Sequence, residues 1–95
     1  MLRISVVCQS PAEVVLKLEG WVSREAVGLL REEGRRWLGQ EQRLALDLEG
    51  VSFIDRAGLD LLAAWAARGV GLRGGSLFVR TLLQHRGLAQ ESENG

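Results

Sequence analysis

The sequence predicts one α/β domain, a four-stranded mixed sheet with its first strand antiparallel at the edge, helices packed on one face, and the element order ββαβαβα. Two observations support this prediction. The chain has 95 residues, of which 46% are hydrophobic and 25% charged, and these values suit a single globular core. Its strand-like segments alternate apolar and polar residues, and helix-like segments separate the later strands, which favours parallel pairing through right-handed crossovers.

The first two strands are expected to form a hairpin. Residues 2–7 and 13–19 alternate apolar and polar side chains with a period of two, which is typical of strands with one solvated face. A turn-forming run at residues 9–11 separates them. Cys8 is expected to be a buried strand residue, and as the only cysteine it excludes an internal disulfide.

Two helices flank the third strand. Ser23 is expected to cap a helix that ends near Gly39, because apolar residues between them recur at spacings of three and four. Residues 43–48 alternate again and are predicted to be a strand. A second helix is expected to begin after Asp55 and to run to about Arg68.

The last third of the chain is rich in glycine. Glycines between residues 69 and 75 are expected to break the chain before a short strand, Ser76–Val79, which runs almost directly into a last helix, Arg80–Arg86. Residues 90–95 are polar and have no periodicity. We therefore expect a single domain over residues 1–89 and a disordered tail at 90–95.

Polar residues on the predicted strands indicate a sheet that is covered on one face only. Lys17, Glu19 and Asp47 occupy alternate positions, whereas strands covered on both faces read as continuous apolar runs. This pattern argues against a doubly wound nucleotide-binding fold, and the chain has no GxGxxG or P-loop spacing. No cofactor is therefore expected.

Charge and composition exclude several kinds of ligand. Twelve basic and twelve acidic residues give a formal net charge of zero, so no long-range field would attract nucleic acid. Cys8 and His85 are the only residues of their types, so no cysteine- or histidine-based metal site is expected. The chain shows no export signal and no apolar run long enough for membrane insertion, so we expect a cytoplasmic location.

Residues 44–62, LALDLEGVSFIDRAGLDLL, contain the most informative motif. An alternating strand leads through Gly50 and an apolar link, Val51 to Phe53, to Asp55 at a helix start. This segment resembles the STAS family, the domain shared by sulphate transporters and bacterial anti-sigma-factor antagonists, and the resemblance extends along nearly the whole chain. It implies a STAS-like fold and a protein partner such as an anti-sigma factor or related switch kinase.

The resemblance also indicates how this chain departs from those antagonists. Their D-S-S-G motif, in which the partner kinase phosphorylates the second serine, falls on Asp55, Arg56, Ala57 and Gly58. Ala57 has no hydroxyl group, so we expect no phosphorylation at the usual serine position, and Ser52 is the nearest hydroxyl before Asp55. The connection before the last helix is expected to be shorter than the family's usual loop there.

A second branch of the family carries D-T-A-G and serves as a small cytoplasmic subunit bound to the ATPase of a phospholipid transporter. Asp55, Ala57 and Gly58 agree with that motif, and Arg56 replaces its threonine. This resemblance implies a transporter ATPase as the alternative partner.

The second helix is expected to bury one side and to present the other to a partner. Leu59, Leu62, Ala63 and Ala66 form the predicted inward stripe. The residues predicted to face outward or sideways are Asp60, Leu61, Ala64, Trp65 and Arg68. Because an exposed leucine and tryptophan would form an apolar patch, we expect a protein interface there.

Residues around the helix start complete the predicted site. Asp55 is expected to cap the second helix and could also contact the partner. Trp21 lies at the same edge of the sheet and is expected to be either a rim contact or a lid on the first helix. The predicted partner-binding residues are Asp55, Arg56, Ala57, Gly58, Asp60, Leu61, Trp65 and Trp21.

Three functions are consistent with the predicted fold, namely a phosphorylation-independent STAS regulator, a STAS subunit of a transport ATPase, and a small enzyme. An enzyme would need a nucleophile, a base or a metal cluster, and the motif offers only Asp55 beside Arg56. The sequence therefore predicts a protein-binding module without catalytic activity.

Overall fold

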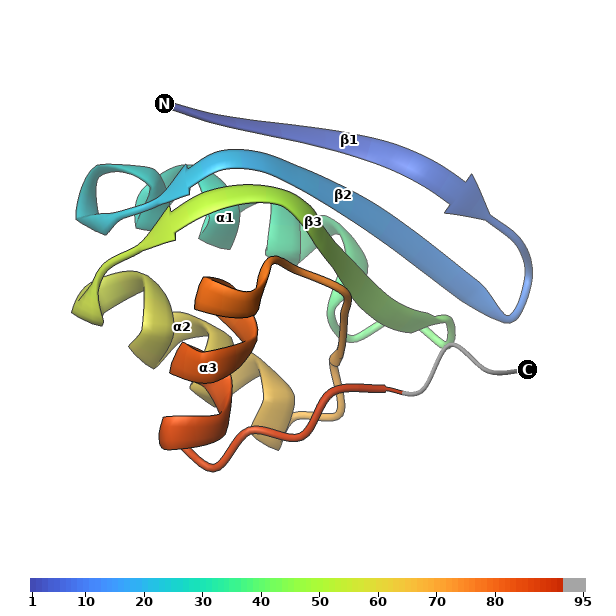
Figure 1. Ribbon diagram of the computed structural model, residues 1–95. Helices are drawn as coiled ribbons and strands as arrows, with labels where there is room; N and C mark the ends of the chain where they lie inside the picture. The colour runs from blue at the N-terminus through green and yellow to red at the C-terminus, as the bar shows by residue number, and fades with distance from the viewer. Residues whose placement is uncertain (92–95) are drawn as a thin grey trace.

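The computed structural model describes residues 1–91 and has the predicted element order ββαβαβα. Figure 1 shows the three helices gathered on one side of the sheet, with the other face uncovered. The elements are β1 (Leu2–Gln9), β2 (Glu13–Val22), α1 (Arg24–Trp37), β3 (Arg43–Ile54), α2 (Arg56–Ala67), β4 (Gly71–Arg73) and α3 (Leu77–His85).

The sheet has the strand order β1-β2-β3-β4. β1 is antiparallel to β2 at one edge, and β2, β3 and β4 are parallel to one another. The predicted mixed sheet with its antiparallel edge strand is therefore confirmed. None of the helices within residues 1–91 is long and apolar enough to cross a membrane.

The alternation along the strands determines which face the helices cover. Leu16 and Leu46 are register partners and fully buried beneath the helices. Lys17 and Asp47, one position further along each strand, are also partners but lie on the open face and are only half-buried. Strand residues therefore place their apolar side chains against α1, α2 and α3.

Cys8 is exposed, so the predicted buried position is wrong. The register of β1 against β2 shifts between Val6 and Cys8, which makes Cys8 the partner of Val15. A bulge of this kind changes the side to which the following residues point. Periodicity alone placed Cys8 on the wrong side because it assumes an uninterrupted strand.

β3 is longer than the six residues predicted for it. It runs from Arg43 to Ile54, and the expected apolar link at Val51 to Phe53 forms its last part. These residues pair with the end of β2, where the register shifts twice. β3 therefore carries the chain directly to Asp55 at the start of α2.

The last strand and helix both begin earlier than predicted. Residues 71–73 form β4, and Ser76, predicted to start a strand, instead caps α3 by accepting a hydrogen bond from the Val79 amide at 3.2 Å. Gly74 and Gly75 have φ values of +71° and +108°, which form the turn between the strand and the helix. The strand and helix are therefore joined by this turn rather than following one another directly.

The C-terminal segment lies along the free edge of β4. The Glu91 amide donates a hydrogen bond to the Leu72 carbonyl at 2.9 Å, and the Glu91 carboxylate pairs with Arg73 at 2.8 Å. Glu91 also pairs with Arg43. Glu91 is therefore held against β4, and residues 92–95 of the tail predicted at 90–95 lie outside the described part of the chain.

The predicted orientation of α2 is wrong on one flank. Leu62 is fully buried as expected, but Leu61 and Trp65 are also buried, each with only 4% of its surface exposed. Trp65 lies against Gly34 of α1, where an added Cβ would be 2.4 Å from the indole ring. The predicted inward stripe of α2 accounted for its contact with the sheet but not for its contact with α1.

Replacing Trp65 with alanine is expected to lower the free energy of unfolding by about 3–5 kcal/mol, because it removes a large buried aromatic side chain. Urea denaturation followed by circular dichroism measures this change. Trp21→Ala is the matched control, since Trp21 is 53% exposed, and its loss is expected to be about 1 kcal/mol or less. Equal effects of the two substitutions would contradict the packing of α2 against α1.

Candidate functional site

The helices α1 and α2 begin at the same edge of the sheet, where β2 and β3 end. β2 ends at Val22 and α1 begins at Arg24, whereas β3 ends at Ile54 and α2 begins at Arg56. Val22 and Ile54 are partners in the parallel ladder. The two helix N-termini are therefore held side by side, as Figure 1 shows at the ends of the β2 and β3 arrows.

One carboxylate caps both helix starts. Asp55 Oδ1 accepts a hydrogen bond from the Gly58 amide at 2.9 Å, and Asp55 Oδ2 accepts one from the Arg24 amide at 2.8 Å. Ser23 occupies the cap position of α1, as predicted, but its hydroxyl makes no capping bond and instead donates to Glu25 at 3.3 Å. Asp55 therefore performs the capping role that the sequence assigned to Ser23.

These contacts also favour the ionised form of Asp55. The backbone N–H of Gly58 lowers the pKa of Asp55 most, and the backbone N–H of Arg24 lowers it further. Both amides lie at positively polarised helix N-termini. Since each carboxylate oxygen already accepts a backbone hydrogen bond, Asp55 is positioned to hold the fold rather than to transfer a proton.

Gly58 occupies a position where no side chain fits. A Cβ there would lie 2.0 Å from the Val22 carbonyl oxygen. That carbonyl also accepts a hydrogen bond from the Asp55 amide at 3.3 Å. Gly58 is buried, so its part in the predicted site is to let α2 approach the end of β2 closely.

The predicted site residues of the first turn of α2 share one shallow hollow. Arg56 is exposed and Ala57 is half-buried. Both line the hollow together with Arg24, Asp55 and Asp60. Asp60 forms an ion pair with Arg86 at 2.5 Å, which connects α2 to the end of α3.

Two exposed aromatic residues lie at the ends of the strands beside this turn. Trp21 and Phe53 are register partners, and 53% and 43% of their respective surfaces are exposed. Their neighbours Val22 and Ile54 are buried, which gives Trp21 and Phe53 the opposite orientation. Sequence analysis included Trp21 and missed Phe53, although the apolar pair at positions 53 and 54 allows only one of them to face the helices.

Leu61 and Trp65 are nearly buried and line the bottom of hollows along α2. Leu61 lines the hollow that follows, together with Ala57 and Asp60, and Trp65 lies further along α2. Their burial makes the expected exposed apolar patch on α2 wrong. The exposed apolar surface at this edge belongs to Trp21 and Phe53 instead.

The described residues 1–91 contain no group of three or more histidine, cysteine, aspartate or glutamate side chains that could hold a metal ion.

Comparisons with known proteins identify one family and one solved structure of similar fold. The family described as "Mlab, STAS domain" matches residues 5–91. The chain is also similar to the solved structure of the anti-sigma factor antagonist SpoIIAA in its unphosphorylated form, with a TM-score of 0.74 and 20% sequence identity over 96% of this chain and 90% of that one. A search of curated protein sequences finds no match.

Gly58→Ala is expected to lower the free energy of unfolding by about 1–3 kcal/mol or more, because the new methyl group would collide with the Val22 carbonyl. The matched control is Gly28→Ala in α1, where nothing lies within 4 Å of an added Cβ. That change is expected to stabilise the protein by about 0.5–1 kcal/mol, since alanine favours helix. Thermal or urea unfolding of both variants measures the difference, and a stable Gly58→Ala protein would refute the close approach.

The capping role of Asp55 is expected to appear as a pH dependence of stability. Because the folded-state pKa lies below the ordinary value of 3.8, ionised Asp55 stabilises the fold above that pH. The contribution is lost as the pH falls through the folded-state pKa. The stability difference between the wild type and Asp55→Asn, measured by urea unfolding from about pH 7 downward, is therefore expected to be constant to about pH 5 and then to shrink. A difference that does not change with pH would contradict this role.

Proposed function

The chain belongs to the STAS domain family, and on this basis we propose that it is a protein-binding regulatory module without catalytic activity, similar to anti-sigma-factor antagonists. Its partner is an anti-sigma factor or a related switch kinase, bound in the cytoplasm at the start of α2. The observation that carries this proposal is the exposed Arg56 at the start of α2, together with the exposed pair Trp21 and Phe53 near the ends of β2 and β3. Aromatic and arginine side chains are the residues that contribute most to protein interfaces.

The proposed contact surface is revised from the one expected on sequence. Arg56, Ala57 and Asp60 remain as direct contacts, and Trp21 and Phe53 form the adjoining apolar rim. Asp55 and Gly58 hold the first turn of α2 in place through their contacts with Arg24 and Val22. Leu61 and Trp65 support the surface from the interior.

Binding is proposed to occur without phosphorylation at the usual serine position. In antagonists of this family a phosphate at the position of Ala57 would add a dianion to a helix N-terminus within the interface. Ala57 offers no hydroxyl, and the nearest one along the chain, on Ser52, donates to the Gly20 carbonyl at 3.3 Å. Arg56 instead provides a permanent positive charge, so binding is regulated by the supply of the partner or by a signal acting elsewhere.

The second candidate is a subunit bound to the ATPase of a phospholipid transporter. Asp55, Ala57 and Gly58 agree with the D-T-A-G motif of that branch, and alanine at position 57 is the specific feature that favours it. This candidate has the same contact surface and differs in the identity of the partner. An enzyme is the least supported function, because Asp55 is engaged by two backbone amides.

The full chain is expected to capture one partner from an extract of its host, identified by mass spectrometry. Arg56→Ala and Trp21→Ala are each expected to weaken that complex about tenfold, since each removes an exposed side chain of the proposed surface. Arg36→Ala, which removes an exposed arginine from the last turn of α1, is the control and is expected to have little effect. Titration calorimetry with the purified partner measures all four affinities.

Addition of ATP to the same complex tests the absence of the phosphorylation switch. No phosphate is expected on residues 52–58 by peptide mapping, and the complex is expected to persist. Stoichiometric phosphate on Ser52, or equal binding by all the variants, would contradict the proposal. The captured partner decides between the candidates, since an anti-sigma factor or switch kinase supports the regulator and a transporter ATPase supports the subunit.

A further inference from the structure

A groove between α1 and α2 continues from the first turn of α2 toward its last turn. It consists of three adjoining hollows that share lining residues. Ala57 and Asp60 line both the hollow at the helix start and the next one, and Arg31, Leu61 and Ala64 line both that second hollow and the third. The third hollow has a volume of about 420 Å³. The groove is therefore long and open, which suits a chain segment better than a small molecule.

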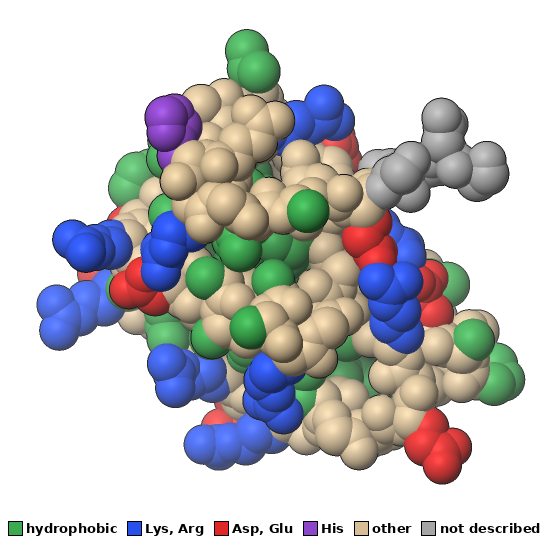
Figure 2. All heavy atoms as spheres, turned by 90° about the horizontal axis from the view of Figure 1, so that it is seen from below, with side chains coloured by type: hydrophobic (Ala, Val, Ile, Leu, Met, Phe, Trp, Pro, Cys, Tyr) green, Lys and Arg blue, Asp and Glu red, His purple; other side chains and the backbone are tan. Residues whose placement is uncertain are grey.

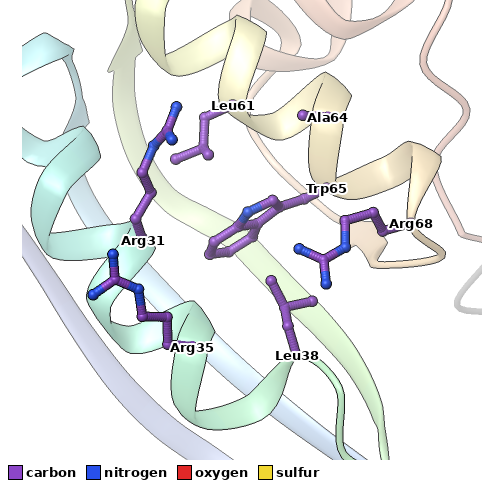
Figure 3. Close-up of a pocket in the computed structure, with 7 residues that line it drawn as sticks. All are labelled: Arg31, Arg35, Leu38, Leu61, Ala64, Trp65 and Arg68. Atoms are coloured by element: carbon purple, nitrogen blue, oxygen red, sulfur yellow. The ribbon is translucent and has the colours of Figure 1, made fainter.

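Arginines from both helices surround the third hollow. Arg31 and Arg35 of α1 and Arg68, the residue that follows α2, line it together with Leu38, Leu61, Ala64 and Trp65. Figure 3 shows Arg31 and Arg68 on opposite sides of the Trp65 ring. Among these lining side chains, the polar ones carry only N–H donors and no acceptor. A complementary ligand must therefore supply acceptors, and carboxylates match guanidinium groups best within proteins.

Few carboxylates in the described part of the chain pair with Arg31, Arg35 and Arg68. Arg35 pairs with Glu32 at 3.0 Å, but the two side chains are 76% and 71% exposed, so the pair contributes little. No carboxylate within residues 1–91 forms an ion pair with Arg31 or Arg68. These guanidinium groups are consequently available to a partner without breaking strong internal contacts.

The floor of the groove is apolar, and the rim is not uniformly basic. Leu61 and Trp65 are nearly buried, and Figure 2 shows hydrophobic side chains between the basic groups of the helical face. Asp60 and Glu32 lie beside the same arginines, and the chain as a whole has no net charge. A nucleic acid would meet these carboxylates along its backbone and would leave the apolar floor uncovered.

We propose that this groove binds an acidic amphipathic segment of the partner protein, with carboxylates against Arg31 and Arg68 and apolar side chains over Leu61 and Ala64. The inference rests on the proposed function, because the groove continues the contact surface at the start of α2. It adds the chemistry of the partner segment and identifies the second half of α2 as part of the interface. Salt weakens such binding because the charges are close to solvent.

The test uses the full chain and a fluorescein-labelled peptide of about 15 residues containing glutamate, leucine and alanine, with the leucines at helical spacing. Fluorescence anisotropy measures its affinity. The double variant Arg31→Gln/Arg68→Gln is expected to bind about tenfold more weakly than the wild type, and Arg36→Gln to bind like the wild type. Circular dichroism verifies that each variant is folded. The side-chain indole N–H resonance of Trp65, assigned with Trp21→Phe and Trp37→Phe variants, is expected to shift on titration.

The second peptide, in which every glutamate is replaced by glutamine, is expected to bind at least about tenfold more weakly. Equal affinity for the two peptides, an unshifted Trp65 resonance, or equal effects of the double variant and Arg36→Gln would overturn the inference. Tighter binding of a single-stranded oligonucleotide or of inorganic pyrophosphate at the same arginines would also overturn it, in favour of a phosphate ligand.

The captured partner separates this inference from the proposed function. If Arg56→Ala weakens the natural complex and Arg31→Gln/Arg68→Gln does not, the proposed function stands and the groove inference fails. If the acidic peptide binds through Arg31 and Arg68 while the full chain captures no protein, the groove inference stands and the proposed function fails.

Discussion

Asp55 connects four elements of this fold through its carboxylate and its backbone. It follows β3 directly, accepts a hydrogen bond from Gly58 in the first turn of α2, and accepts another from Arg24 at the start of α1. The Asp55 amide donates to the Val22 carbonyl at the end of β2. Because both helix N-termini are polarised positively, a single negative charge stabilises the two together. The direction in which each helix leaves the sheet therefore depends on this junction.

This junction limits which residues of the motif are free to meet a partner. Asp55 and Gly58 cannot vary without disturbing the ends of β2 and α1, because one supplies both caps and the other has no room for a side chain. Arg56 and Ala57 lie between them, and neither is constrained in this way, since Arg56 is exposed and Ala57 is half-buried. Changes at these two positions can alter the charge and the modifiability of the surface while the fold is kept. The alanine at position 57 and the positive charge at position 56 are differences of this kind from the D-S-S-G motif.

Local sequence patterns predicted the structure correctly where neighbours in the chain determine it, and most errors arose where distant residues do. The alternation of Leu16 with Lys17, and the helix cap at Asp55, depend on neighbours in the chain, and both were predicted correctly. The burial of Trp65 depends on Gly34, which belongs to another helix and leaves space for the ring. Cys8 was misplaced by a bulge, and Ser76 was assigned to a strand although it caps α3. The errors at Cys8 and Trp65 arose because periodicity assumes an unbroken element with a single buried face, whereas Ser76 was misassigned although its cap, on the Val79 amide, is local.

The packing of Trp65 also explains why the arginines of the groove remain exposed. The Trp65 ring packs against Gly34 where α1 and α2 meet, so this part of their contact lies deep. The longer side chains on either side, Arg31 and Arg68, cannot enter that contact and instead line the hollow above it. Their charges lie close enough to the indole to define a basic rim around an apolar floor. Stability and the proposed binding therefore use different atoms of the same helix pair, which allows the groove to present charge without weakening the core beneath it.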